Sequence, residues 1–204
     1  MGFFSTTVSI ARYKIDGNFK GQILETVAKA LQQNMISDID GQTIEKTVGW
    51  TSFENPFKPD FSGFSFSIGT YLIFSMRIDK KSIPSKVIKK HTTIEMAKLL
   101  AVSGKKYFST DEKKTIKERV INVLCGRIPA TPNVYDILWN YEDGFLWFFS
   151  NLKAANEEFE TLFAKSFNLM PLRLFPYTMA DLTAGLTNLN RDILPKLSST
   201  KFTT

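Results

Sequence analysis

Two segments of the chain repeat apolar residues at the spacing of a helix. Between Phe19 and Asn34 the apolar positions fall at i, i+1, i+4 and i+8, as Ile23, Leu24, Val27 and Leu31. Between Leu152 and Phe167 a second stripe contains Ala155, Phe159, Leu162 and Phe163. Both patterns place the apolar residues on one side of a helix. We therefore expect two amphipathic helices, and a further short helix at Leu182–Leu194.

Short apolar or alternating runs, which are typical of strands, fill most of the remaining sequence. Turn residues separate them: Asp16-Gly17-Asn18 follows the first run, and Glu142-Asp143-Gly144 is a hairpin signal between the last long pair. Tyr71–Ile78 is apolar enough for a central strand. The predicted strands are Thr6–Ile15, Thr43–Ser52, Phe61–Ile68, Tyr71–Ile78, Asn133–Tyr141, Phe145–Phe149 and Leu172–Pro176.

The segment between the fourth and fifth predicted strands has a different pattern. Ser85 is placed to cap a helix from Lys86 to Ala101, and Ser103-Gly104 ends it. Ser109 followed by Glu112 is a capping-box pattern for a second helix that ends near Leu124. The segment therefore predicts a helical hairpin inserted between two strands.

These elements predict an α+β fold, a mostly antiparallel sheet covered by helices, with an inserted basic helical hairpin. We expect a central domain formed by residues 1–79 and 128–180, the hairpin at residues 80–127, and a C-terminal tail at residues 181–204. Phe145–Phe149, one of the longest uncharged apolar runs, is far too short to span a bilayer, so no membrane segment is expected.

Charge is concentrated in the hairpin. The net charge of the chain is +6, but Arg77–Arg127 holds 14 of the 26 Lys and Arg residues and five of the 20 acids. That segment carries +9 and the rest of the chain carries −3. A basic segment of this kind attracts a polyanion, although lysine also fills ordinary solvated helix surfaces. In the loop between the helices, Tyr107 beside Lys105 and Lys106 is a candidate for stacking on a base, while Phe108 is expected to pack the hairpin itself.

The sequence offers little for catalysis. It holds one histidine, His91, expected at the surface, and one cysteine, Cys125, expected as a buried structural thiol. A metal-dependent nuclease would need converging carboxylates, for which the candidates are Asp136, Glu142 and Asp143. Turns favour acids for conformational reasons, so the last two need no catalytic role. We expect no enzyme activity, no cofactor and no bound metal.

The motifs between about Thr6 and Met179 are together typical of a known family. The most specific element is Ile83-Pro84-Ser85-Lys86-Val87-Ile88-Lys89. Further motifs are Val48-Gly49-Trp50, Tyr71–Arg77, Ser109–Val120, Leu124-Cys125-Gly126-Arg127, Asp136-Ile137-Leu138-Trp139, the strand ending at Phe149, the helix Lys153–Phe167 and Met170-Pro171-Leu172. In this order the motifs resemble the recombination-associated RdgC family of bacteria. The chain resembles a short form that lacks the family's C-terminal region, and Pro129 stands where the family has an aromatic residue.

The resemblance implies a cytoplasmic, nucleoid-associated protein that binds double-stranded DNA without sequence preference, as a homodimer, and modulates recombination. Single-stranded DNA is a second candidate partner. The expected DNA contacts are Lys80, Lys81, Lys86, Lys89, Lys90, Lys105, Lys106, Lys113, Lys117 and Arg127. Two alternatives stay open: a protein interaction module that uses the basic hairpin, and a metal-dependent nuclease.

Overall fold

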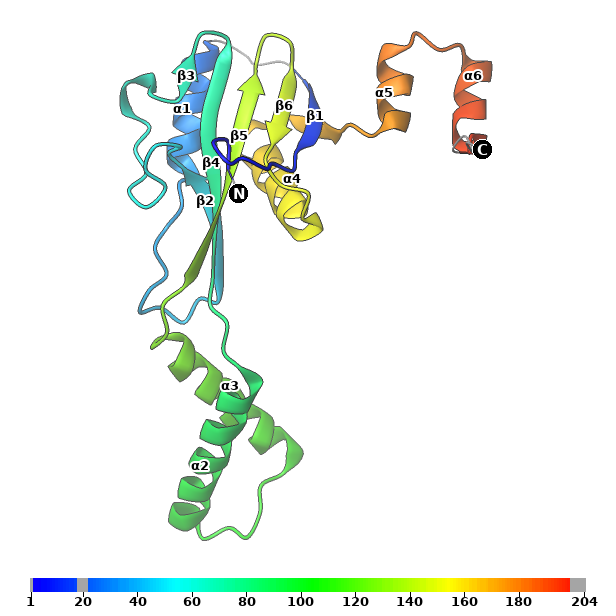
Figure 1. The fold of residues 1–204 in the computed structure, drawn as a ribbon. Helices are drawn as coiled ribbons and strands as arrows, with labels where there is room; N and C mark the ends of the chain where they lie inside the picture. Colours follow the sequence, from blue (N-terminus) through cyan, green and yellow to red (C-terminus); the bar gives the residue numbers. More distant parts are fainter. Residues whose placement is uncertain (1, 18–21, 199–204) are drawn as a thin grey trace.

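The structure is a computed structural model that describes residues 2–17 and 22–198 (Figure 1). Its strands are β1 (Ala11–Asp16), β2 (Lys46–Thr51), β3 (Ser67–Ile68), β4 (Tyr71–Lys80), β5 (Thr131–Asn140), β6 (Phe145–Phe148) and β7 (Met170–Arg173). Its α-helices are α1 (Ile23–Gln33), α2 (Ser85–Ser103), α3 (Thr110–Cys125), α4 (Lys153–Phe167), α5 (Pro176–Thr183) and α6 (Asn188–Ile193). The predicted turn residue Asn18, the predicted helix start at Phe19 and residues 199–204 of the tail lie outside the described part.

The strands form one sheet in the order β2-β4-β5-β6-β1-β7, with β3 also paired to β4. Every ladder in it is antiparallel, which confirms the predicted α+β class. The longest pair is β4 with β5, whose register runs from Tyr71 opposite Asn140 to Lys80 opposite Thr131. These two strands also lead to and from the helical insertion, so their shared far end is the point from which the insertion projects.

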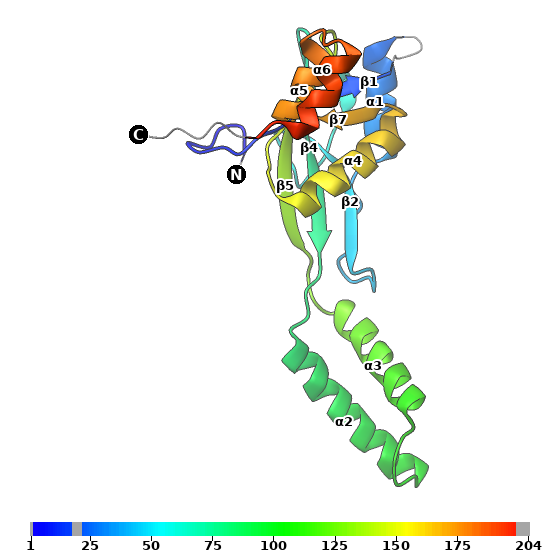
Figure 2. The ribbon, with the colours of Figure 1, turned by 90° about the vertical axis from the view of Figure 1, so that its right-hand side faces the viewer.

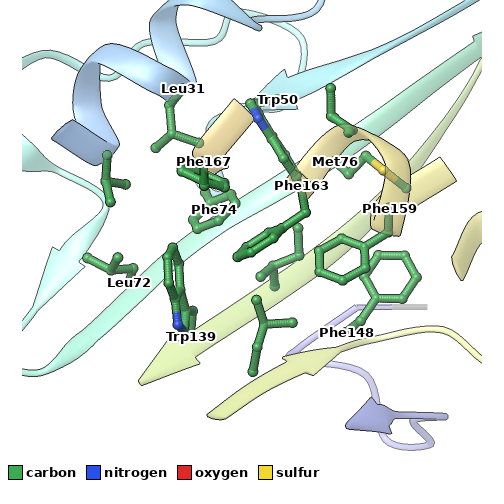
Figure 3. Packing of buried hydrophobic residues seen from close by; sticks show 14 of the residues in the cluster. Leu31, Trp50, Leu72, Phe74, Met76, Trp139, Phe148, Phe159, Phe163 and Phe167 are labelled. Atoms are coloured by element: carbon green, nitrogen blue, oxygen red, sulfur yellow. The ribbon is translucent and has the colours of Figure 1, made fainter. Parts of the chain in front are cut away.

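Side chains along β4 point alternately to the two faces of the sheet, and this alternation locates the core. Leu72, Phe74 and Met76 are fully buried on the side of the sheet that α1 and α4 cover. In Figure 3, Phe74 lies beside Phe167 and Met76 lies close to Phe159, both from α4. The Phe148 and Phe159 rings stack with centroids 4.7 Å apart. Each fully buried aromatic side chain stabilises the folded state by roughly 2–3 kcal/mol through the hydrophobic effect.

Gly49 permits a close chain crossing at the edge of this core. A Cβ atom at that position would lie 2.6 Å from the backbone of Ile36. The crossing is held by hydrogen bonds from the Ile36 amide to the Trp50 carbonyl and from the Trp50 amide to the Asn34 carbonyl, both 2.9 Å. This accounts physically for the Val48-Gly49-Trp50 motif.

The α2–α3 hairpin, called the tip from here on (residues 80–127), stands away from the body (Figures 1 and 2). In Figure 2, α1 and α4 lie on one side of the sheet, and the N-terminal segment leaves on the other. The capping box of α3 is confirmed: the Glu112 amide donates to Ser109 Oγ and the Ser109 amide donates to the Glu112 carboxylate.

Several predicted boundaries are wrong. Ser85 is the first residue of α2 rather than its cap; Pro84 holds the cap position without a side-chain hydrogen bond. The predicted strand Phe61–Ile68 is reduced to the two residues of β3, because Gly63 and Phe64 both have positive φ and break the extended chain. The first strand begins at Ala11, five residues later than Thr6. In place of one helix at Leu182–Leu194 the chain forms two, α5, which begins before the predicted tail, and α6 within it.

Candidate nucleic-acid interface

The tip has a narrow core of its own. Ile116, Val120 and Leu124 recur on the side of α3 that packs against α2, and all three are buried. On α2 only Thr92 among the described residues reaches the same degree of burial. Two helices cannot enclose more apolar surface than this, so Val87, Ile94 and Val123 stay exposed. Most of the charged side chains of the tip lie on the remaining, exposed surface.

Lys81, one of the predicted DNA contacts, is instead buried where the tip joins the body. It is 5% exposed, and its ammonium donates to the carbonyl oxygens of Gln42 and Cys125, each at 2.7 Å. Cys125 is the last residue of α3, where the helix dipole favours a positive charge. The prediction for Lys81 is wrong, because its charge is used to join α3 to the body.

Cys125 itself is buried beside this lysine, as expected of a structural thiol. Burial is the main cause that raises the pKa of its thiol, and the charge of Glu45 adds to the rise. The neutral thiol is therefore the dominant form near neutrality, which is a poor nucleophile.

Lys105 lies at the far end of the tip and is paired with an acid. Its ammonium donates to Glu112 at 2.6 Å, and this contact, followed by the Ser109 backbone hydrogen bond, lowers the pKa of the Glu112 carboxyl to about 2. The pair is exposed, so it offsets part of the charge of Lys105 without removing it from solvent. Beside it, Tyr107 is 80% exposed, whereas Phe108 is half-buried and lines a hollow with Leu99 and Ile116, as expected.

The other predicted contacts are exposed. Among the described residues they have no ion-pair partner: Lys80, Lys86, Lys89, Lys90, Lys106, Lys113, Lys117 and Arg127. They do not form one surface. Lys89 and Lys117 line the same groove of about 430 Å³ between α2 and α3, while Lys90 is on the outer side of α2 and Lys80 is at the end of β4.

Two cations that sequence reasoning left out lie in a second groove. Lys98 of α2 and Arg119 of α3 line a hollow of about 260 Å³ together with His91 and Arg127. His91 and Lys98 are seven residues apart, which is two helical turns, so the sequence did contain a signal for a shared side. Which sides of two helices face each other depends on their packing, which spacing alone does not give.

Two of the three carboxylates considered for a nuclease, Asp136 and Asp143, accept structural hydrogen bonds. Asp136 accepts from Ser75 Oγ at 2.8 Å and from the Phe3 amide at 2.7 Å. Asp143 accepts from Asn140 in the β5–β6 turn at 2.7 Å. Within residues 2–17 and 22–198 there is no group of three or more His, Cys, Asp or Glu side chains that could hold a metal ion.

A known protein family matches most of the chain. The family model described as "Putative exonuclease, RdgC" matches residues 8–193 of the 204-residue chain. The chain belongs to the RdgC family. The match confirms the resemblance that the Ile83-Pro84-Ser85 element indicated, and in this RdgC-family chain that element forms the entry to α2. A search of curated proteins finds no match. Among the described residues, no helix is long and apolar enough to cross a membrane.

Proposed function

We propose that this RdgC-family protein binds duplex DNA without sequence preference, through contacts between cations of the tip and backbone phosphates. In this proposal it is a non-enzymatic modulator of homologous recombination that acts at the nucleoid. The observation that carries the proposal is a projecting two-helix tip of net charge +9, in which Lys105 forms the one ion pair found there among the described residues.

Simple electrostatics favours a phosphate partner. The rest of the chain carries −3, so a polyanion is attracted to the tip and repelled by the body. Lysine binds phosphate as a point charge and reads no base edge, and most of the free cations of the tip are lysines. The expected complex is therefore insensitive to sequence and sensitive to salt.

Retardation of two duplexes of unrelated sequence tests the proposal. Replacement of Lys86, Lys89 and Lys90 by Glu should weaken binding to both duplexes equally. The matched control replaces Lys29, Lys58 and Lys165, three exposed lysines of the body, by Glu and should retain most of the affinity. A loss of affinity for only one duplex would indicate base readout. Equal losses of affinity in both triple variants would show that the tip is not the DNA-binding surface.

A homodimer is part of the proposal. Apolar side chains of α5 and α6, namely Leu182, Leu189 and Ile193, are at least 48% exposed, and a second copy would cover surface of this kind. Molar mass measured by light scattering should correspond to two chains. A single-stranded probe in the same retardation assay decides whether that form of DNA is also bound.

The alternative function is a protein interaction module. The exposed apolar side chains of Val87, Ile94 and Val123 on the tip favour it. It becomes the better account if neither duplex is retarded at about 50 mM salt, where phosphate contacts are strongest. For the nuclease, incubation of DNA with Mn²⁺ should yield no product; cleavage that Asp136→Asn abolishes would overturn the non-enzymatic assignment.

A further inference from the structure

The second groove of the tip brings together charges that lie far apart in sequence. His91, Glu95 and Lys98 line it from α2, and Arg119 and Arg127 line it from α3 and the residues just after that helix. Its remaining lining is apolar: Ile94, Val120, Val123 and Leu124. The groove measures about 260 Å³ and lies on the side of the hairpin away from Lys89 and Lys117.

This composition suits a phosphate group. Three permanent cations and one carboxylate give the groove a net charge of +2, and none of these groups is in an ion pair within the described part of the chain. Two guanidinium groups offer the paired donors that match phosphate oxygens. The apolar lining keeps part of the water away, which strengthens each charge interaction relative to the open surface. The groove that Lys89 and Lys117 line is also partly apolar but contains no guanidinium group, and the remaining exposed lysines of the tip line neither groove.

We propose that this groove, lined by His91, Lys98, Arg119 and Arg127, is the phosphate-binding site of the tip, and that Glu95 weakens its affinity. The proposal rests on the DNA-binding function given above and specifies where a backbone phosphate is held. The other tip lysines then contact further phosphates as point charges, without the paired donors of a guanidinium group.

Charge removal on either side of the groove tests the proposal. Lys98→Gln should weaken duplex binding about tenfold at 50 mM salt and reduce the salt slope by about one. The matched control is Lys114→Gln, which removes the same charge from an exposed position of α3 about 120° from the side of Val120 and should change affinity less than about threefold.

Glu95→Gln supplies the sharper test, because damage to the fold cannot produce a gain. It should tighten duplex binding about three- to fivefold, whereas Glu118→Gln, an exposed acid of α3 outside the groove, should change it less than twofold. Equal effects of Glu95→Gln and Glu118→Gln would overturn the proposal while leaving DNA binding itself intact.

The single histidine gives an independent readout of the site. One ring signal in the NMR spectrum reports on His91, and it should shift on addition of either the duplex or inorganic pyrophosphate. A shift with pyrophosphate but not with the duplex would show that the groove binds small anions and that DNA is not its ligand, which would overturn the proposal. No shift with either probe would overturn the groove, and retardation of DNA by the same sample would show that the proposed function survives.

Discussion

The buried ammonium of Lys81 gives the most specific prediction about how the tip is held. Its two hydrogen bonds, to the carbonyls of Gln42 and Cys125, connect the last turn of α3 to the segment that precedes β2. The Lys81 amide also donates to the Glu45 carbonyl at 2.8 Å. Lys81→Met keeps the apolar stem and removes the charge, which leaves the buried Cys125 carbonyl and the part-buried Gln42 carbonyl without this donor.

The size of the effect follows from those two contacts. A hydrogen bond from a charged group contributes about 1.5–3 kcal/mol, and an ammonium that is taken out of water loses several kcal/mol of hydration. The two terms partly cancel in the wild-type protein, but each carbonyl left unsatisfied in the variant costs about 1–3 kcal/mol. We therefore expect Lys81→Met to lower the free energy of unfolding by about 2–4 kcal/mol.

Lys80→Met is the matched control, since the neighbouring side chain is exposed at the end of β4 and loses the same charge. Urea denaturation of the two variants measures the difference. Amide exchange should also rise at the C-terminal turn of α3 in Lys81→Met and stay unchanged in Lys80→Met. Equal stability of the two variants, with equal protection of Cys125, would refute the role given to Lys81.

Three further predictions concern single side chains. Gly49→Ala should destabilise the protein by more than about 2 kcal/mol in thermal unfolding, because the added methyl group meets the Ile36 backbone at 2.6 Å; an unchanged melting temperature would contradict that contact. Tyr13→Phe should cost about 1–3 kcal/mol, since the Tyr13 hydroxyl shares its one proton between Asn156 Oδ1 and Glu160 Oε1. Burial raises the pKa of Tyr13, so the free energy of unfolding should fall above pH 10 in the wild type and less in the variant. The pKa of Glu112 is lowered from 4.5 to about 2, so its carboxylate stabilises the start of α3 fully above pH 4.5 and loses that contribution as the pH falls towards 2. Protection of the first α3 amides from exchange should follow this pH dependence in the wild type and lack it in Glu112→Gln.

Local patterns predicted the elements well where one sequence signal dominates. The capping box of α3 and the hairpin turn before β6 depend on contacts between near neighbours, which are visible in the sequence. The apolar stripe of α4 is likewise a local repeat, and its members are buried. The prediction for the Phe61–Ile68 segment failed because Phe61 and Phe66 are buried on either side of a 3₁₀ helix, Ser62–Phe64, where side-chain spacing does not report strand geometry.

The candidate site was harder to predict because its contacts join distant parts of the chain. Lysine is normally exposed, so nothing in the sequence marks Lys81 as a buried donor to a carbonyl 44 residues away. The clustering of basic residues was visible as a charge count, but their division between two grooves depends on how α2 and α3 pack. The sequence therefore identified the basic segment, but it did not show that Lys81 is buried or that the exposed lysines lie on different sides of the tip.

The salt dependence of duplex binding tests the central claim most directly. With about five phosphates neutralised, a plot of log affinity against log salt between about 50 and 200 mM should have a slope of −4 to −5 for any duplex sequence. Loss of three phosphate contacts in the Lys86, Lys89 and Lys90 variant should make that slope shallower by about three. A wild-type slope near zero, or a slope that the variant leaves unchanged, would contradict phosphate binding by the tip.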